Sequence, residues 1–423
     1  MLFVYYYIAY CLCDRLKSAI KLVGAVMISF DNLLNITPKI DYYPQFNPKG
    51  NKDDISFDGI KALTFESAAY TGQKTKVFAH IGFPKDTKKP VPAVVLVHGG
   101  GGHPEDVWIK KWNYRGYAAI SMDTTGFFPT KPIPHLYEGF KEGLARELVP
   151  PFYEEGYTVA PSNCDMNDCL KPIEDQWMYH AVADVILAHN ILRADPRIDA
   201  QKIGICGISW GGVITSIAIG YDSRFSFAVP IYSSGYLKDG HTYLNQFFKK
   251  PDTEHWYAEK RFSTLKIPVM WLCWNDDNNF SINSNTMSYL DTKDNNPNTC
   301  LSIKHQMGHS HRAGYTPEES YWFADTIING GKVPKVTATK NGRNLILSAC
   351  DNLKSVRLFY LTQKLSYSEK EKYGFTSTFM DGEWQILDID KTATEITLPK
   401  NAVCYYVEFT LENGIVLSSP YFE

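Results

Sequence analysis

Short apolar runs recur through most of the chain, and each run is bounded by glycine, proline or polar residues. Runs of this length predict strands that are buried on both faces of a sheet. Segments between the runs carry an apolar residue at every third or fourth position, which predicts helices. The predicted strands cover residues 93–97, 117–122, 203–208, 225–232, 267–273 and 300–304, and the predicted helices cover 105–114, 176–193, 212–218 and 317–328.

The alternation of these strands and helices decides the expected fold class. A buried strand, a helix and a further buried strand form a unit whose two strands run parallel. We therefore predict an α/β protein with a mostly parallel sheet and helices on both faces. Residues 61–83 differ, because apolar and polar positions alternate on both sides of Thr71-Gly72-Gln73, which predicts an antiparallel hairpin.

One segment interrupts this pattern ahead of the helix at 176–193. Residues 126–175 are rich in proline and aromatic side chains and follow neither the strand nor the helix period. The segment leaves the carboxyl end of a strand, where open α/β sheets bind ligands, and loops of this length usually carry a function. We expect residues 129–175 to form an insertion that walls or caps the pocket; a surface excursion is the alternative.

The pattern changes again near Pro334. Short alternating runs follow, separated by turn signals such as Asn341-Gly342 and Asn413-Gly414, and they predict a small antiparallel β-sandwich. The runs are 344–348, 356–361, 394–398 and 403–409. The expected organisation is an N-terminal extension at 1–55, an α/β domain at 56–332 and a sandwich domain at 333–423.

The N-terminal extension resembles neither a membrane span nor a signal peptide. Residues 31–55 are polar and contain prolines, which predicts an extended lead-in. The apolar run 1–13 is too short to cross a bilayer, and it lacks a preceding positive charge and a clear cleavage site. We favour an overlong start, with Met27 as the true beginning, over a weak anchor, and expect no stable membrane span.

Charge and cysteine usage exclude some classes of protein. The chain of 423 residues has a net charge of −3, so it lacks the basic surface expected of a nucleic-acid partner. The cysteines number nine, are scattered, and include Cys206 and Cys273 inside predicted buried strands, which argues against a disulfide framework. A reducing, cytoplasmic location is the simpler expectation; secretion, or weak anchoring through residues 1–30, is the alternative.

The segment Gly207-Ile208-Ser209-Trp210-Gly211 is the strongest chemical signal in the chain. It fits the G-x-S-x-G pattern, and it lies between a predicted strand and a predicted helix, as a nucleophile elbow requires. The glycines leave room where strand and helix cross, and the sharp turn exposes the Ser209 hydroxyl. We predict that Ser209 is a nucleophile; a chance match to a short pattern is the alternative.

A glycine-rich loop, His98 to His103, follows the predicted strand at 93–97. Its composition allows close approach of a substrate and frees backbone N–H groups. We expect the N–H groups of Trp210 and of Gly100 or Gly101 to form an oxyanion hole. A phosphate-binding loop is the weaker alternative, because no Gly-Lys-Ser/Thr follows.

Carboxylates and histidines follow two later strands. Asp276 or Asp277 could serve as the acid of a triad, or could cap the helix predicted after Ser281. His309 or His311 could serve as the base, so the order along the chain would be serine, acid, histidine. His305, His309 and His311 could also bind a metal ion, but H-E-x-x-H is missing and the segment has no helical spacing. We therefore expect no metal and no other cofactor.

These motifs together resemble the acetyl xylan esterase and dienelactone-hydrolase-like group of α/β-hydrolases, over about residues 60–330. The segments that carry the resemblance are His98–Gly102, Trp112–Tyr117, Trp177–Ala183, Gly207–Gly212 and Met307–His311 with Gly314 and Glu318-Glu319. The resemblance implies Asp277 as the acid, since Phe280 follows it at the family's spacing, with Asp276 as alternate. It also implies His309, which follows Gly308, with His311 as alternate. The segment 129–175 matches no motif of the group.

The resemblance implies a serine esterase that removes small acyl groups, acetyl in particular, from a carbohydrate. An aminopeptidase or other acyl hydrolase on the same fold is the first alternative, and a non-catalytic carbohydrate-binding protein is the second. A homo-oligomer is compatible with the sequence. The sandwich also resembles tails that some bacterial hydrolases of this kind carry.

Overall fold

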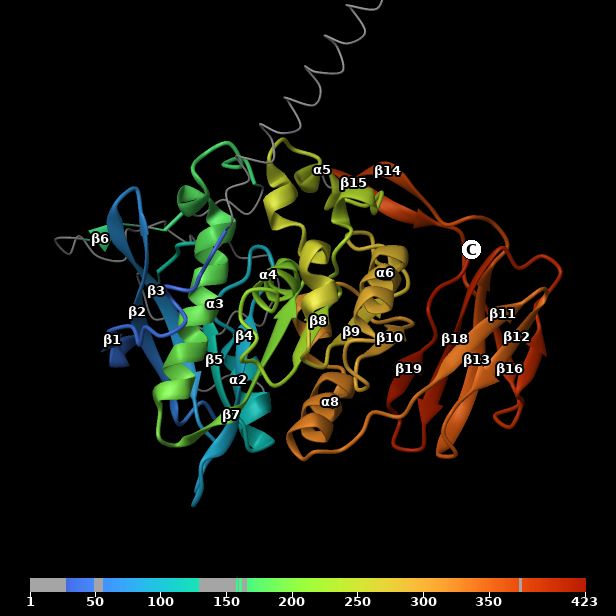
Figure 1. Ribbon diagram of the computed structural model, residues 1–423, viewed down its shortest axis with the longest axis horizontal. Coiled ribbons are helices and arrows are strands. Elements are labelled where there is room, and N and C mark those ends of the chain that lie inside the picture. The colour runs from blue at the N-terminus through green and yellow to red at the C-terminus, as the bar shows by residue number, and fades with distance from the viewer. Residues whose placement is uncertain (1–27, 49–55, 129–156, 159, 162–165, 373–374) are drawn as a thin grey trace, which may run out of the picture.

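The computed structural model describes residues 28–48, 56–128, 157–158, 160–161, 166–372 and 375–423 (Figure 1). The expectations for the true start of the chain, and most of those for the insertion at 129–175, lie outside these residues. Among the described residues, no helix combines the length and the apolar character needed to cross a membrane.

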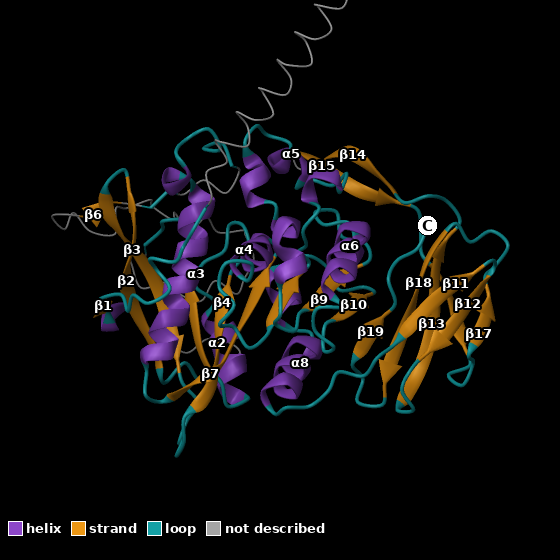
Figure 2. Cartoon of the chain, in the orientation of Figure 1, coloured by secondary structure: helices purple, strands orange, loops and turns teal. Residues whose placement is uncertain are grey.

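A large twisted sheet forms the centre of the molecule, in the strand order β1-β2-β3-β5-β4-β7-β8-β9-β10, with β6 paired to β3 (Figure 2). Along this order, β5, β4, β7, β8, β9 and β10 pair in parallel, whereas β1–β2, β2–β3 and β3–β5 are antiparallel pairs; β6 is parallel to β3. The predicted fold class, a mostly parallel sheet in an α/β protein, is therefore confirmed. The strands are β1 (Ile40–Tyr42), β2 (Ile60–Tyr70), β3 (Gln73–Gly82), β4 (Val91–Val97), β5 (Ala118–Met122), β6 (Tyr157–Thr158), β7 (Ile198–Ile208), β8 (Ala228–Ile231), β9 (Met270–Trp274) and β10 (Cys300–Lys304).

Helices cover both faces of the sheet. On one face α2 packs against α8, where the Trp112 and Tyr321 rings lie 4.6 Å apart, and on the other α3 packs against α4. The helices are α2 (Asp106–Tyr114), α3 (Trp177–Ala194), α4 (Trp210–Ala218), α5 (Asn245–Phe248), α6 (Ile282–Thr292), α7 (His311–Tyr315) and α8 (Glu318–Ile328), with short 3-10 turns at Pro44–Phe46, Ile173–Asp175, Leu237–Asp239, Thr253–Trp256 and Ala258–Thr264. The predicted helices are thus present, while α5 and α7 were not foreseen.

Two local expectations need correction. The lead-in at 31–55 is not extended throughout: it contains the 3-10 turn Pro44–Phe46, and its extended part includes β1, whose residue Ile40 pairs with Phe65 of β2. The strand predicted at 203–208 begins earlier, at Ile198, because Ile198 pairs with Val91 at the start of β4. In both cases the hydrogen-bond partner is remote in sequence, so the local pattern could not reveal it.

The remaining strands form a C-terminal β unit, residues 337–423, with antiparallel sheets β11-β12-β17, β16-β13-β18-β19 and β14-β15. Their bounds are β11 (Thr337–Asn341), β12 (Asn344–Ser348), β13 (Leu353–Leu361), β14 (Ser366–Lys372), β15 (Phe375–Asp381), β16 (Gln385–Ile389), β17 (Glu395–Thr397), β18 (Cys404–Leu411) and β19 (Val416–Ser418). The four predicted runs correspond to β12, β13, β17 and β18. Strands β11 and β16 are more exposed and β14 has a more polar sequence, whereas β19 is buried but has only three residues, so none of them gave a clear signal.

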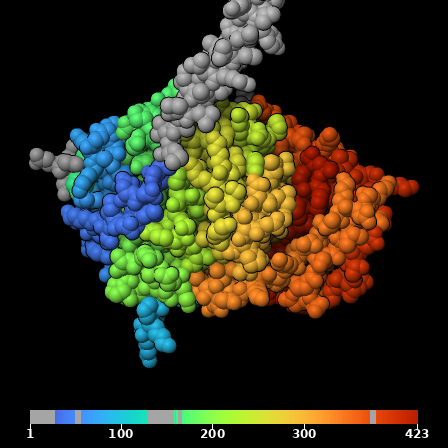
Figure 3. Space-filling view, in the orientation of Figure 1, coloured from blue at the N-terminus to red at the C-terminus, as the bar shows by residue number. Residues whose placement is uncertain are grey.

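The C-terminal β unit packs directly on the α/β part of the chain (Figure 3). Strand β19 lies beside β10, the last strand of the central sheet, where the Ile303 N–H donates to Ser418 Oγ at 3.0 Å. This contact covers a sheet edge that would otherwise be open to pairing with other chains. The described cysteines, most of them buried, are all free thiols.

Candidate active site

The turn between β7 and α4 places Ser209 at the carboxyl edge of the sheet. Its backbone has φ 56° and ψ −120°, a strained conformation for a residue with a side chain. A Cβ on Gly207 would lie 2.1 Å from the Gly211 carbonyl oxygen, and a Cβ on Gly211 would lie 2.1 Å from the Val97 carbonyl oxygen. Only glycine therefore fits where strand and helix cross, as the pattern predicts.

Ser209, His309 and Asp277 form one hydrogen-bonded chain. His309 Nε2 lies 2.9 Å from Ser209 Oγ, and His309 Nδ1 lies 2.8 Å from Asp277 Oδ2. The three residues follow β7, β9 and β10, whose carboxyl ends meet at one edge of the parallel sheet. A serine, a histidine and an acid in this arrangement can activate a hydroxyl as a nucleophile.

The loop between β9 and α6 holds the Asp277 carboxylate rigidly. The side chain is fully buried, and its Oδ1 accepts hydrogen bonds from the backbone N–H groups of Asn279 at 2.8 Å and Phe280 at 3.2 Å. The other oxygen is thereby directed at His309. Asp276, the alternate acid, is half-buried, and burial raises the pKa of its carboxyl. The structure brings Asp277, and not Asp276, to the histidine.

Two aromatic rings enclose the His309 imidazole. The Tyr232 ring stacks on it at 4.5 Å, and the Phe280 ring lies parallel to it at 6.0 Å on an interplanar angle of 4°. The Tyr232 hydroxyl donates to the Ser310 carbonyl at 2.6 Å, which fixes the residue that directly follows His309. Sequence reasoning assigned neither ring this role; the position of Tyr232 directly after β8, beside β7, was the available signal.

His311, the alternate base, lies under the glycine-rich loop instead. Its Nε2 accepts a hydrogen bond from the Gly99 N–H at 3.0 Å, so this nitrogen carries no proton. Burial lowers the pKa of His311, which favours the neutral form that this bond requires. His98 supports the same loop, because its Nε2 accepts from the Thr124 N–H at 3.1 Å and its Nδ1 lies 2.8 Å from the Gly99 carbonyl.

The glycine-rich loop runs beside the nucleophile. A Cβ on Gly99 would lie 3.1 Å from Ser209 Cβ, and a Cβ on Gly100 would lie 2.8 Å from the Trp210 ring. The N-terminus of α4 adjoins the same place, with its partial positive charge. This geometry is compatible with the oxyanion hole expected from Gly100, Gly101 and Trp210, which stays a prediction.

An aromatic cluster adjoins the elbow. The Trp210 side chain is largely buried against three rings. The ring centroids of Trp177, Phe247 and Phe248 lie 5.4, 5.6 and 6.0 Å from that of Trp210. Such a cluster leaves the indole little freedom to move.

The three histidines of the 305–311 segment do not converge on one point. His305 Nδ1 lies 3.2 Å from Asn275 Nδ2, and its ring lies 5.3 Å from Phe359. His309 and His311 have the different partners given above. Within the described part of the chain, no group of three or more His, Cys, Asp or Glu side chains is arranged to hold a metal ion.

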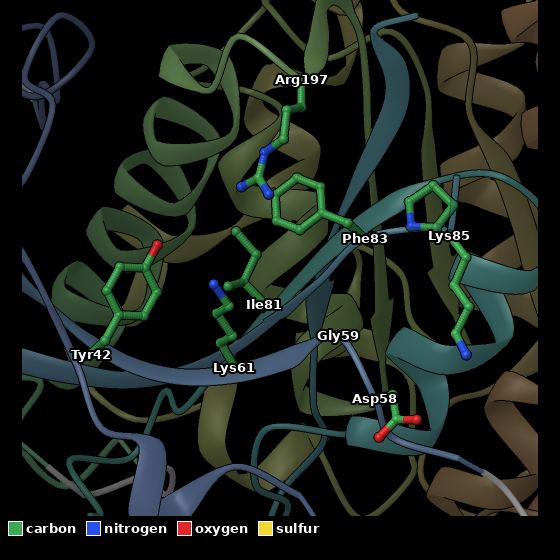
Figure 4. Close-up of a pocket in the computed structure, with 9 residues that line it drawn as sticks. Tyr42, Asp58, Gly59, Lys61, Ile81, Phe83, Lys85 and Arg197 are labelled. Carbon is green, nitrogen blue, oxygen red and sulfur yellow. The ribbon is translucent and has the colours of Figure 1, made fainter. Parts of the chain in front are cut away.

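A surface cavity of about 270 Å³ lies beside the antiparallel strands β1, β2 and β3 (Figure 4). There the Arg197 guanidinium stacks on the Phe83 ring at 3.6 Å. The cavity is lined by Tyr42, Asp58, Gly59, Lys61, Ile81, Phe83, Pro84, Lys85 and Arg197. It includes none of the predicted site residues, so it is not the candidate active site.

The parallel sheet and the serine at a strained strand-to-helix turn define an α/β-hydrolase. The chain belongs to the acetyl xylan esterase (AXE1) family, whose model matches residues 37–270, more than half of its length. The protein is therefore a serine-type carboxylic-ester hydrolase. No curated protein sequence matches the chain.

Several solved structures resemble the chain over most of its α/β part. The acetyl xylan esterase from Paenibacillus sp. R4 is 15% identical, with a TM-score of 0.46, over 70% of this chain and 91% of its own. Acetyl xylan esterase 1 from Thermoanaerobacterium sp. JW/SL YS485 is 13% identical, with a TM-score of 0.45, over 70% and 90%. The Pyrococcus horikoshii acylaminoacyl peptidase is 16% identical, with a TM-score of 0.41, over 61% and 39%. The family assignment rests on the sequence match alone.

Proposed function

We propose that this enzyme removes acetyl and similarly small acyl groups from carbohydrate esters, with Ser209 as nucleophile, His309 as base and Asp277 as the orienting acid. The observation that carries the proposal is the continuous hydrogen-bonded chain from Ser209 through His309 to the buried Asp277. The family's printed name, acetyl xylan esterase, supports the choice of acetyl group and sugar.

The reaction follows from the direction of these hydrogen bonds. Ser209 Oγ attacks the ester carbonyl carbon while its proton passes to His309 Nε2. Asp277 keeps the proton of His309 on Nδ1, so that Nε2 is free to accept, and it stabilises the imidazolium that forms. His309 then returns the proton to the departing sugar oxygen, and the acyl group stays on Ser209. Water, deprotonated by the same histidine, releases the acid and restores the serine.

The tetrahedral intermediate carries a negative oxygen that needs hydrogen-bond donors. The backbone N–H of Trp210 and that of Gly100 or Gly101 supply them in this proposal. Removing one such donor typically costs about 3 kcal/mol of barrier. His311 and His98 have a supporting role, since both hold the Gly99 peptide in place.

Ester hydrolysis by the purified protein tests the proposal. We expect turnover of p-nitrophenyl acetate to exceed that of the butyrate and octanoate, and acetate to be released from acetylated xylo-oligosaccharides. Ser209→Ala should abolish both activities. Ser226→Ala is the matched control, since Ser226 bonds the Gln201 carbonyl away from the site. Unchanged turnover in Ser209→Ala would remove the nucleophile; hydrolysis of peptide p-nitroanilides in preference to esters would favour a peptidase.

A further inference from the structure

The loop that carries Asp277, residues 275–280 and here named the acid loop, forms hydrogen bonds with residues outside the α/β part of the chain. In Figure 1 the hairpin β14–β15 extends from the C-terminal β unit toward α5 and the central sheet. Thr378 Oγ1, on β15, donates to the Asn278 carbonyl at 2.7 Å, and the Met380 N–H donates to Asn278 Oδ1 at 3.1 Å. The hairpin therefore forms hydrogen bonds with both the backbone and the side chain of Asn278, the residue next to Asp277.

The same unit holds the other end of this loop. Asn275 Nδ2 donates to Tyr406 Oη, on β18, at 3.2 Å. Tyr406 is fully buried, and its ring is fixed by Phe359 at 4.9 Å and by Trp384 at 5.3 Å. Because packing leaves the Tyr406 side chain little freedom to move, its hydrogen bond holds Asn275 in a well-defined position.

The hydroxyl of Tyr367, on β14, is buried within reach of the charges of the acid loop. The pKa of Tyr367 is raised by burial and, to a smaller extent, by the neighbouring carboxylates of Asp277 and Asp276. The α/β part also contributes, since the Tyr243 N–H donates to the Asn278 carbonyl at 3.3 Å and Thr242 Oγ1 donates to the Asn279 carbonyl at 2.6 Å. The Asn278 carbonyl thus accepts from both parts of the chain at once.

The acid loop in turn sets the position of the histidine. The N–H groups of Asn279 and Phe280 orient the Asp277 carboxylate, and the Phe280 ring lies parallel to the His309 ring. A displacement of Asn278 would therefore move both groups that align His309. Catalysis by such a triad is sensitive to misplacement, since a shift of about 1 Å can reduce the rate about a hundredfold.

We propose that the C-terminal β unit is a positioning element of the active site, in which Thr378 and Tyr406 hold the acid loop so that Asp277 and Phe280 keep His309 aligned with Ser209. This inference rests on the proposed function of the three residues. It gives the C-terminal β unit a role in turnover that does not require the unit to touch the substrate.

Substitution of Thr378 tests the proposal. Thr378→Val removes the hydroxyl donor and keeps the side-chain shape, while Thr378→Ser keeps the donor. We expect Thr378→Val to lower kcat for p-nitrophenyl acetate about tenfold with KM unchanged, as expected of a positioning defect. Thr378→Ser should restore most of the loss. Tyr406→Phe, which removes the contact at the other end of the loop, should act in the same direction.

The matched control is Thr397→Val, in the same unit. Thr397 is also on a strand, and its hydroxyl donates to Asn344 Oδ1 without contact to the acid loop. Its kcat should equal that of the wild type, and its unfolding midpoint should match that of Thr378→Val. An equal loss of kcat in Thr378→Val and Thr397→Val would show that the loss comes from general destabilisation of the C-terminal β unit, and it would overturn the proposal.

Three further outcomes are decisive. A rise in KM for acetylated xylo-oligosaccharides, with p-nitrophenyl acetate kinetics unchanged, would mean that the hairpin contacts substrate and does not position the acid. Full activity of Thr378→Val beside an inactive Ser209→Ala would leave the proposed function intact and overturn only this inference. Retained turnover in Ser209→Ala would instead remove the proposed function itself.

Discussion

Replacing Asp277 with asparagine should disable His309 as a base, because the ring proton would move from Nδ1 to Nε2. In the native protein Asp277 Oδ1 accepts two backbone N–H groups, and only Oδ2 faces His309 Nδ1. An amide at 277 would keep its oxygen on the two N–H donors, because the opposite orientation would set donors against donors. Its NH₂ group would then face Nδ1. The stable tautomer of His309 would carry its proton on Nε2, where it could not accept the proton of Ser209.

The size of this effect follows from the loss of the base. The equivalent acid-to-amide change in a serine protease triad lowers kcat about ten-thousandfold, which corresponds to a barrier increase of about 5 kcal/mol. We expect a loss of similar size for Asp277→Asn, measured as kcat for p-nitrophenyl acetate. The backbone hydrogen bonds to Oδ1 survive the change, so the unfolding midpoint should move little.

Asp276→Asn is the matched control, because the neighbouring carboxylate is half-buried and does not reach His309. We expect it to retain activity within a few-fold of the wild type. If Asp277→Asn kept activity within tenfold of the wild type, the tautomer argument would be wrong. If Asp276→Asn caused the larger loss, the role of the acid would move to Asp276.

Two further predictions concern acyl selectivity and acid stability. Trp210→Ala, which keeps the backbone N–H, should open space above Gly100 and raise the ratio of butyrate to acetate kcat/KM about tenfold; an unchanged ratio would show that the indole does not limit acyl length. Burial lowers the pKa of His80 to about 4, so between about pH 6.5 and pH 4 the unfolded chain binds a proton that the folded chain excludes. As the pH is lowered from about 6.5 to about 4, the free energy of unfolding of the wild type should therefore decrease by up to about 3 kcal/mol more than that of His80→Phe. Urea unfolding at several pH values measures this difference. Parallel stability curves for the two proteins would contradict this origin.

The central sheet could be predicted from the sequence because its strands are buried on both faces. Such strands appear as continuous apolar runs, and the elbow glycines are dictated by a local crossing of strand and helix. The candidate residues Ser209, Asp277 and His309 could be placed at one edge because each follows a parallel strand. Chain order and strand direction alone carry that inference, and the structure brings the three side chains within hydrogen-bond distance.

Features that depend on remote contacts could not be predicted. His311 lies two residues from His309, and remote contacts separate the two: His309 meets Ser209 and Asp277, whereas His311 bonds Gly99 on a distant loop. The rings of Tyr232 and Phe280 gain their role from packing on His309, which no periodicity records. The hairpin β14–β15 has a polar sequence, and its function in our proposal depends on Thr378 meeting Asn278, 100 residues earlier in the chain.

Covalent labelling of the nucleophile tests the central claim most directly. A fluorophosphonate reacts with an activated serine and remains attached, so digestion and mass spectrometry identify the modified residue. The account predicts a single adduct on Ser209, loss of esterase activity in proportion to labelling, and no adduct in Asp277→Asn under the same conditions. Complete loss of activity with the adduct on another residue, or full activity after Ser209 is labelled, would contradict it.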